Sequence, residues 1–392
     1  MLCHQGTKNK PRMSNGEKQC NIGIVTMPIV EAGVIALSKL TDIVSSLSTG
    51  TCLITGDAGY TFFKDNHKVE VYAVGESPKP NTLARIAKYI PIQLRITYRF
   101  AWTLRKVDLW IFFTGGLASP LPILIGKLLG KKTLLVYPAS DVEIMRAQSK
   151  ILPKPMELLS RASSIISDKI IVYSQTLIAQ YNLQKYIHKI SIANEYFIDI
   201  DRFKIRHKFD ERENLVAYVG RLSQEKGALN FVRAIPEILQ ERDDIKFLVG
   251  GDGPLRNKIE NAVDEKRLNG KIKLTGWIPH DKLPDYINKL KLIVLPSYTE
   301  GLPAIMLEAM ACGTPVLVTP VGAIPDVIKH GETGLIMENN TPKSIARNIL
   351  KAMGYPGLSK IAQNARKLIE REYTYEDTVE QYKVALDELI KM

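Results

Sequence analysis

Short apolar runs alternate along almost the whole chain with longer stretches in which apolar residues recur at helical spacing. Uninterrupted apolar runs are typical of strands in parallel sheets that are covered on both faces. We expect strands in the first half at 21–27, 51–56, 69–75, 108–115, 132–139, 169–174 and 189–194, and in the second half at 214–220, 245–251, 271–276, 292–297, 314–320 and 333–337. Two such sets predict an α/β protein with two doubly wound parallel-sheet domains, which bind ligands beyond the carboxyl ends of their strands.

The alternation of strand and helix patterns is interrupted at few places, and these set the predicted domain limits. Residues 1–20 are polar and are interpreted as a disordered tail, followed by an N-terminal domain at 21–200. The alternation gives way to charged and turn residues at 195–215, so a second domain is placed at 201–373. The amphipathic pattern of 374–392 predicts a C-terminal helix that packs back on the N-terminal domain.

Length and composition fit this organisation, and the charge distribution limits the classes of partner that the protein could bind. A chain of 392 residues, 45% hydrophobic and 24% charged, suits a globular protein of two domains. The net charge is +12, and residues 1–200 carry most of it, with 24 Lys and Arg against 14 Asp and Glu. This imbalance indicates that the first half meets an anionic partner: nucleic acid, a phosphorylated substrate or an acidic membrane surface.

The sequence also favours one cellular compartment. No run of about 18 apolar residues that could span a membrane is visible, and the opening residues lack the apolar region of a signal peptide. The four cysteines are scattered without metal-ligand spacing, which suits free thiols in a reducing cytosol. We therefore expect a cytoplasmic protein.

Two carboxylates, Glu300 and Glu308, flank the start of a predicted helix that follows the strand at 292–297, with Pro303 expected in its first turn. Eight residues of helix rise about 12 Å. This is too far for a retaining-hydrolase acid pair, which needs roughly 5 Å. Carboxylates accept hydrogen bonds from vicinal hydroxyls, and a helix N-terminus favours phosphate, so sugar, diphosphate and ribose in a row would match the segment. Alternatively, Glu300 caps the helix and Glu308 is solvated.

Two cations stand in the loop after the first strand of the second domain. Arg221 and Lys226 could neutralise a diphosphate by charge-assisted hydrogen bonds, or they could be a solvated surface pair. The glycine-rich turn at 248–256 follows the next strand. It lacks the third glycine of a dinucleotide fingerprint, and a tight turn is a sufficient explanation for it.

At this point the residues resemble a known family. "GRLSQEKG", "GGDGP", "PSYTEGLPAIMLEAMACGTPVLVTPVGAIPDVI" and "GETGLI" are similar to the retaining GT-B glycosyltransferases of family 4, the glycosyl transferases group 1. The likeness covers nearly all of 214–340 and is weaker in 21–200. It implies a GT-B fold, in which two Rossmann-like domains face each other across a cleft.

The resemblance also implies roles for residues of the second domain. Arg221 and Lys226 would hold the donor diphosphate, Glu300 would contact the transferred hexose, and Glu308 would contact the nucleotide ribose. Gly276 and Trp277 would lie near the base, and Gly301 and Leu302 complete the predicted donor site.

In the first half, Gly33 is the best match to the family's strand-to-helix loop that brings amides to the phosphates. Where many members have a histidine–glycine–serine–aspartate run, this chain has Pro138 in place of the histidine and keeps Asp141. Asp141 is predicted on the acceptor side, with helix capping as the alternative. Asn194 is kept, but Glu195 stands where the family commonly has glycine.

The implied activity is transfer of a hexose from a nucleotide-diphosphate sugar with retention of configuration. The departing diphosphate itself would take the acceptor proton, so the protein's task is to stabilise negative charge on the leaving group. No cofactor is implied besides the donor substrate. No Asp-X-Asp pair lies at a strand end, so no essential metal is expected.

The acceptor side is predicted from the basic segment 81–110, which includes Arg95 and Arg99 and has no acidic residue before Asp108. Aromatic and aliphatic residues are interleaved with the cations, a pattern that fits contact with an anionic membrane surface or lipid phosphate. It fits equally a helix that covers the domain core with its charges solvated. The first interpretation predicts a lipid-linked or membrane-proximal glycan acceptor and a peripheral location at the cytoplasmic face of the membrane.

Two other classes of function compete with this one. The altered run at Pro138 leaves open a catalytically silent GT-B partner subunit. The basic first half leaves open nucleic-acid binding, but the sequence contains no helix-turn-helix, zinc-ligand or RNP-type signature, so no nucleic acid is expected as a partner.

Overall fold

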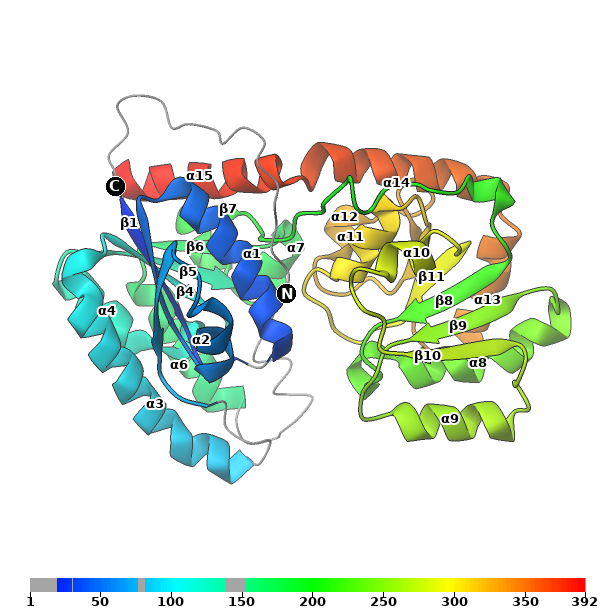
Figure 1. Ribbon diagram of the computed structural model, residues 1–392, viewed down its shortest axis with the longest axis horizontal. Helices are drawn as coiled ribbons and strands as arrows, with labels where there is room; N and C mark the ends of the chain where they lie inside the picture. The colour runs from blue at the N-terminus through cyan, green and yellow to red at the C-terminus, as the bar shows by residue number, and fades with distance from the viewer. Residues whose placement is uncertain (1–19, 30, 77–81, 138–152, 392) are drawn as a thin grey trace. The chain divides into compact units, whose positions relative to one another are not determined.

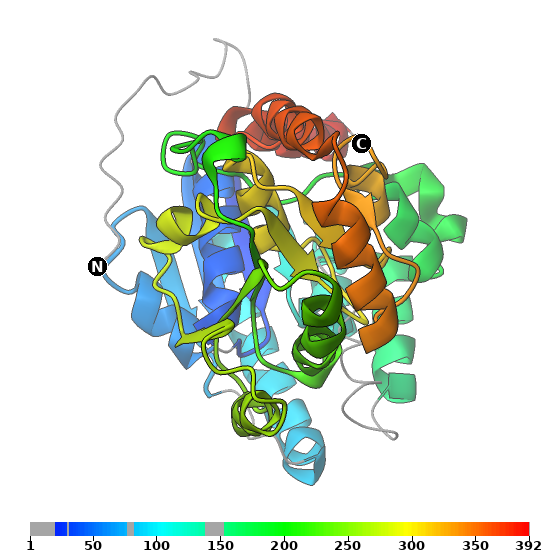
Figure 2. The same ribbon diagram turned by 90° about the vertical axis from the view of Figure 1, so that its right-hand side faces the viewer.

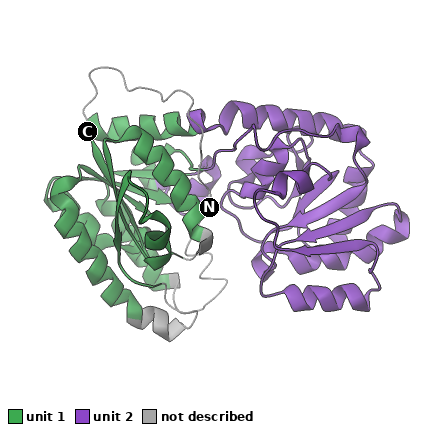
Figure 3. Cartoon of the chain, in the orientation of Figure 1, with its two compact units in different colours: residues 1–172, 185–195, 378–392 green, residues 173–184, 196–377 purple. Residues whose placement is uncertain are grey.

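The computed structural model describes residues 20–29, 31–76, 82–137 and 153–391. The chain forms two compact units (Figure 3). Unit 1 comprises residues 1–172, 185–195 and 378–392, and unit 2 comprises residues 173–184 and 196–377. Each unit is built on a parallel sheet with helices on both faces, which can be followed in Figures 1 and 2.

Unit 1 contains a seven-stranded sheet in the order β3-β2-β1-β4-β5-β6-β7. Its strands are β1 (Asn21–Thr26), β2 (Gly50–Thr55), β3 (Val69–Ala73), β4 (Leu109–Phe113), β5 (Lys132–Tyr137), β6 (Lys169–Val172) and β7 (Ile190–Ile192). All neighbouring strands run parallel. The central strands are continuous apolar runs because helices cover both of their faces. The strand order reverses between β1 and β4.

The helices of unit 1 fall on two sides of this sheet. They are α1 (Glu31–Leu47), α2 (Asp57–Phe63), α3 (Thr82–Thr103), α4 (Pro120–Leu128), α6 (Pro153–Ile166) and the greater part of α15 (Tyr375–Lys391), with 3₁₀ turns at Leu104–Lys106, Gly116–Ala118 and Gln184–Lys189. Right-handed crossovers put α1 and α2, which lead toward β3, on one face, and α3, α4 and α6, which lead toward β6, on the other.

Unit 2 contains a six-stranded parallel sheet in the order β10-β9-β8-β11-β12-β13. Its strands are β8 (Leu215–Val219), β9 (Lys246–Gly250), β10 (Ile272–Gly276), β11 (Leu292–Leu295), β12 (Val316–Val318) and β13 (Leu335–Ile336). Here the order reverses between β8 and β11. Such a reversal opens a crevice at the carboxyl edge of the sheet, because the loops that follow the two strands lead away in opposite directions.

The helices of unit 2 complete its core. They are α7 (Gln175–Gln180), α8 (Ala228–Glu241), α9 (Arg256–Glu265), α10 (Leu283–Ile287), α11 (Ala304–Ala311), α12 (Ile324–Val327), α13 (Pro342–Met353) and α14 (Leu358–Glu372), with 3₁₀ turns at Phe209–Glu211 and Gln224–Lys226. Helices α8 and α13 pack together over the sheet, where Phe231 contacts Tyr218 and Phe247. Helix α13 begins as expected for an N-cap threonine followed by proline, since the Thr341 hydroxyl accepts from the Ser344 N–H.

The structure confirms the predicted α/β class and the two doubly wound parallel sheets, and every observed strand lies within one residue of its predicted segment. The division of the chain is more complex than a single boundary near residue 200. Residues 173–184 belong to unit 2, where the Thr176 N–H and hydroxyl donate to the carboxylate of Asp326 in α12. Helix α15 joins unit 1 from Thr378 onward, and its Glu388 pairs with the buried Lys169.

Candidate functional site

The predicted residues of unit 2 gather at the carboxyl edge of its sheet. Lys226 lies in the loop after β8, and Glu300 lies in the loop after β11, so the two residues flank the point where the strand order reverses. Their side chains meet: Lys226 Nζ is 2.6 Å from Glu300 Oε2. Ser297 Oγ donates to the other carboxylate oxygen at 2.7 Å. A cation and an anion therefore span the crevice where this fold class binds its ligands.

This ion pair is largely shielded from water. The Glu300 side chain is 8% exposed and that of Lys226 is 30% exposed. A shielded carboxylate needs such partners, because removing one member of a buried pair typically costs about 3–5 kcal/mol. Two donors on Glu300 fix the orientation of its carboxyl plane. An ammonium group has three donors, so Lys226 can hold Glu300 and still donate to a ligand.

Two glycines allow the loops around this pair to approach closely. Gly227 has φ +69°, and a Cβ there would lie 2.1 Å from the Pro296 carbonyl oxygen. Gly322 has φ +62°, and a Cβ there would lie 2.0 Å from the carbonyl oxygen of Glu300. Only glycine combines the left-handed backbone with this absence of side-chain volume. The glycines after β8 and β12 thus help to place Lys226 and Glu300.

Arg221 has a looser environment than Lys226. Its side chain is 62% exposed, and its Nη1 atom lies 3.9 Å from Glu225 Oε1. Burial acts to raise the pKa of Glu225, but hydrogen bonds, with Ser223 as the largest contributor, together with Arg221 and Lys226 hold that pKa below its ordinary value. An exposed pair at this distance contributes little stability. Arg221 can therefore exchange Glu225 for another anion at low cost.

Glu308 lies within α11 and is almost fully buried. It is not solvated, because its Oε1 is 2.7 Å from His280 Nε2, in the turn between β10 and α10. The second oxygen, Oε2, takes no part in this bond. Sequence reasoning missed His280, although it stands only three residues after the singled-out Trp277.

The other predicted residues of unit 2 differ in how they could meet a ligand. The Gly276 carbonyl accepts from the Gly251 N–H at 2.7 Å, which links the glycine-rich turn after β9 to the end of β10. Trp277 is 73% exposed. Leu302 is buried, so only its backbone could meet a ligand, and the Gly301 carbonyl accepts from the Ala323 N–H.

The sequence analysis predicted Pro303 in the first turn of the helix. In the structure Pro303 is instead the N-cap of α11, with an extended ψ of 117°. The helix begins one residue later, at Ala304. The first N–H groups of an α-helix lack partners within the helix. Those of α11 lie between Glu300 and Glu308 in the chain, as the sequence analysis requires.

The predicted residues of unit 1 are described only in part. Gly33 lies in the first turn of α1, not in the loop before it, and α1 follows β1 at the reversal point of that sheet. Asp141 and Pro138 lie outside the described residues. Arg95 is exposed on α3, and the Arg99 guanidinium lies 5.9 Å from the ring centre of Tyr72. Glu195 is fully buried near Tyr382 of α15, and burial, with a contribution from Glu195, raises the pKa of that tyrosine.

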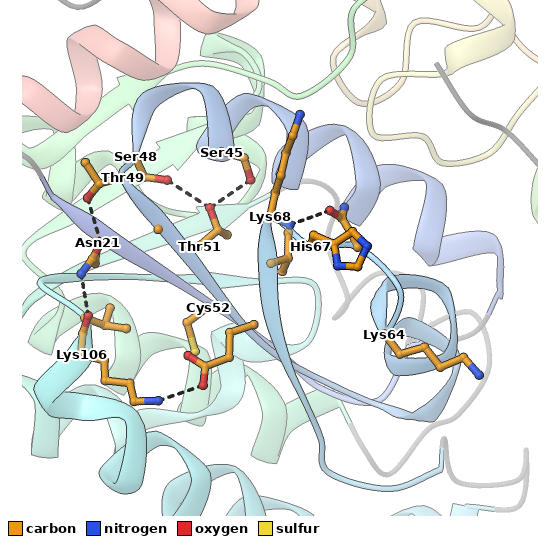
Figure 4. A pocket seen from close by; sticks show the side chains of 15 residues that line it. Asn21, Ser45, Ser48, Thr49, Thr51, Cys52, Lys64, His67, Lys68 and Lys106 are labelled. Carbon is orange, nitrogen blue, oxygen red and sulfur yellow. Dashed lines mark hydrogen bonds and ion pairs between the residues drawn. The ribbon is translucent and has the colours of Figure 1, made fainter. Parts of the chain in front are cut away.

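A hollow in unit 1 does not coincide with any predicted site. It has a volume of about 940 Å³ and lies at the amino ends of β1, β2 and β3 (Figure 4). Thr51 there bonds to both Ser45 and Ser48 at 3.0 Å. Ligands of doubly wound sheets bind at the opposite, carboxyl edge. Within the described residues, no group of three or more His, Cys, Asp and Glu side chains could hold a metal ion.

Fold and site together define a protein of two Rossmann-like domains with charged groups at the carboxyl edge of the second sheet. Residues 199–368, which include the whole site of unit 2, match the family described as Glycosyl transferases group 1. An uncharacterized glycosyltransferase of Methanocaldococcus jannaschii is 32% identical over 180 residues, which is 45% of this chain and 46% of that protein.

Alpha-D-kanosaminyltransferase of Streptomyces kanamyceticus is 29% identical over 195 residues, 48% of this chain and 50% of that protein. The chain thus spans about half the length of the curated relatives it matches. Among solved structures, Anabaena HepE in complex with UDP aligns with a TM-score of 0.75 at 16% identity over 94% of this chain and 100% of that one. The likeness shows that the fold is GT-B.

The contact between Gly322 and Glu300 generates a test of how the site is held. Alanine at Gly322 meets the Glu300 carbonyl, whereas Gly331 has a similar φ of +79° and nothing within 4 Å of its added Cβ. We expect Gly331→Ala to lower the free energy of unfolding by about 1 kcal/mol, the cost of the left-handed conformation. Gly322→Ala should lower it by about 3 kcal/mol because overpacking adds to this cost.

Urea unfolding of the two variants measures the difference. Equal destabilisation would show that the Gly322 contact does not constrain the Glu300 loop.

Proposed function

We propose that this protein is a retaining, metal-independent glycosyltransferase that moves a hexose from a nucleotide-diphosphate sugar to a glycan or lipid-linked acceptor. The observation that carries the proposal is the pair of Lys226 and Glu300 at the reversal point of the unit 2 sheet. The match of residues 199–368 to the group 1 glycosyl transferases supports it, and the fold is shared with HepE, whose structures contain UDP and UDP-glucose.

The charges around the pair explain how a diphosphate would bind. In this structure each cation has an acidic neighbour, Lys226 at 2.6 Å and Arg221 at 3.9 Å. Arg221 leaves its weak pair with Glu225 for the phosphate oxygens, while Lys226 keeps Glu300 and donates a further N–H. Charge-assisted hydrogen bonds to phosphate are about 2.7–2.9 Å long, so they are stronger than the 3.9 Å pair that Arg221 gives up.

The carboxylates then hold the two ends of the donor. Glu300, fixed by Lys226 and Ser297, accepts from hydroxyls of the hexose next to the cations. Glu308, fixed by His280, accepts from hydroxyls of the ribose. The N-terminus of α11 adds positive potential between them.

In the reaction, the acceptor hydroxyl oxygen forms a bond to the anomeric carbon on the face from which the diphosphate leaves. The bond between that carbon and the diphosphate oxygen breaks, and its electron pair stays with the diphosphate. A diphosphate oxygen takes the acceptor proton. Arg221 and Lys226 stabilise the charge that develops on the leaving group, and removing one such donor typically costs about 3–4 kcal/mol of barrier.

A panel of nucleotide sugars tests the proposal by thermal unfolding, with UDP-glucose as the first member. Donor at 100 times its Kd adds about 2.7 kcal/mol to the free energy of unfolding, which raises the unfolding temperature. We expect the shift to persist in EDTA, and hydrolysis of the labelled donor to accompany it. Binding without turnover would point instead to the catalytically silent GT-B subunit, and no shift with any donor would overturn the proposal.

Replacement of Lys226 separates its catalytic from its structural role. Lys226→Ala should lower turnover at least a hundredfold because the leaving-group charge loses a donor. It also strips Glu300 of its cation, so Lys226→Gln, whose amide can still donate to Glu300, is the matched variant. We expect Lys226→Gln to regain most of the lost stability in urea but not the turnover, measured with labelled donor. Near-normal turnover in either variant would contradict the role of Lys226.

The His280–Glu308 bond generates a third expectation. His280→Ala should weaken donor binding by about tenfold, because a hydrogen bond to a charged group contributes roughly 1.5 kcal/mol. His280→Gln, which keeps an N–H donor, should restore most of the affinity in calorimetric titrations. A donor that lacks both ribose hydroxyls should bind the original protein and His280→Ala equally. If the alanine variant loses the same factor with both donors, Glu308 does not act on the ribose.

A further inference from the structure

Helices α3, α4 and α6 form one layer on a single face of the unit 1 sheet. Helix α3 packs against α4, and α4 packs against α6. The contact of α3 with α4 is close, since a Cβ on Gly126 would lie 3.0 Å from the Phe100 ring. The three helices therefore lie next to one another on this side of the unit, and α3 and α4 can be followed in Figure 1.

The surface of α3 is unusual because both of its sides are apolar. Ile92, Ile96 and Phe100 are buried against the unit and hold the helix in place. On the opposite side, four large apolar residues recur at every fourth position and are each 59–68% exposed, namely Ile90, Leu94, Tyr98 and Trp102. This spacing puts them in one stripe along the helix. The stripe does not contribute to the core of the unit.

The neighbouring helices continue the pattern. Leu121, Leu124 and Leu128 are exposed at helical spacing on α4, and Leu158 and Ile165 are exposed on α6. Single exposed apolar residues are normal on a protein surface, but a gathering of them over three adjacent helices marks an interaction site. We call this surface, formed by the nine exposed apolar residues of α3, α4 and α6 together with Leu129, the apolar face.

The charges beside the apolar face are almost all positive. Helix α3 carries Lys88, Arg95 and Arg99 and no acidic residue, and Arg105 follows it. Arg95 and Arg99 also line a hollow of about 490 Å³ between α3 and the end of β3, together with Tyr98 and Leu94 of the stripe. On α6 the acidic Glu157 is paired with Arg161.

We propose that the apolar face and its cationic border bind the surface of a membrane rich in anionic lipids. Apolar side chains enter the boundary between headgroups and acyl chains, while the cations meet lipid phosphates, with Arg95 and Arg99 placing a phosphate in the hollow between them. Tyr98 and Trp102 suit this depth because their rings are apolar and their edges polar. Among the described residues, no helix is long and apolar enough to cross a membrane, so the contact lies in the plane of the surface.

Charge favours lipid over a second copy of the chain. A symmetric dimer through α3 would bring Arg95 and Arg99 of both copies together, and α3 has no acidic residue to pair with them. An anionic bilayer supplies the missing counter-charge. The proposal goes beyond glycosyl transfer and does not rest on it, although it would put unit 1 beside a lipid-linked acceptor.

Co-sedimentation with lipid vesicles tests the proposal. The full chain is mixed with vesicles of phosphatidylcholine alone or with added phosphatidylserine, at low and high salt. We expect binding to the anionic vesicles that weakens as salt rises, because exposed charges are screened. Leu94→Ser with Trp102→Ser, and Arg95→Glu with Arg99→Glu, should each weaken this binding at least tenfold.

The matched control changes two exposed apolar residues outside the apolar face. Val384→Ser with Ile390→Ser on α15 should bind anionic vesicles as the original protein does. Thermal unfolding shows that each variant is folded, and the donor-induced shift of the Leu94→Ser, Trp102→Ser variant shows that unit 2 is intact. If the original protein binds anionic vesicles but shows no donor-induced shift, the result contradicts the proposed glycosyl transfer and leaves the membrane proposal standing.

Three outcomes would overturn the proposal. The first is equal binding of all variants to anionic vesicles, and the second is equal binding to neutral and anionic vesicles. The third is a concentration-dependent dimer that the Leu94→Ser, Trp102→Ser variant abolishes, measured by sedimentation velocity without lipid, since the apolar face would then be a contact between copies of the chain.

Discussion

The ion pair of Lys226 and Glu300 is the constraint on which the proposed donor site depends. It joins the loops after β8 and β11 where the strand order reverses. It also gives the shielded Glu300 carboxylate a cationic partner, without which its burial would be unfavourable. Gly227 and Gly322 let the neighbouring backbones come close enough to frame it. The pair also limits the site electrostatically, because Glu300 offsets part of the Lys226 charge. Arg221 is exposed and only weakly paired, so it is freer than Lys226 to bind an incoming anion.

Much of the fold was predictable because its determinants are local. Each strand is an apolar run bounded by turn residues, so runs such as 215–219 identify themselves without knowledge of their neighbours. The placement of Lys226, Glu300 and Gly276 at one sheet edge follows from the same pattern, since parallel strands end together. Even so, the sequence left the ion pair itself unseen: its partners are 74 residues apart and had been assigned to different parts of the ligand.

The features that sequence analysis missed depend on contacts between distant segments. His280 fixes Glu308 from 28 residues away. Arg212 lies in the segment interpreted as a charged join, yet it is buried and donates to the carbonyls of Leu290 and Cys312 and to the hydroxyl of Thr314. Burial lowers its pKa, although a guanidinium stays charged under such conditions. A charge pattern cannot distinguish such an arginine from a solvated one, because the carbonyls that satisfy it come from loops elsewhere in unit 2.

Helix α3 combines the features that two interpretations of one sequence pattern require. Its basic, apolar sequence fitted either a helix covering the core or a helix at a membrane surface. In the structure Ile96 and Phe100 cover the core, while Leu94 and Trp102, on the other side, face solvent beside Arg95. A helix that only covered a core would gain nothing from the second apolar side, which raises the risk of aggregation. The cations beside that side lower this risk, because they make two copies of the chain repel each other. An anionic surface neutralises these cations, so no such repulsion opposes contact with it. The same residues thus oppose self-association, as expected of a face that meets the proposed anionic membrane.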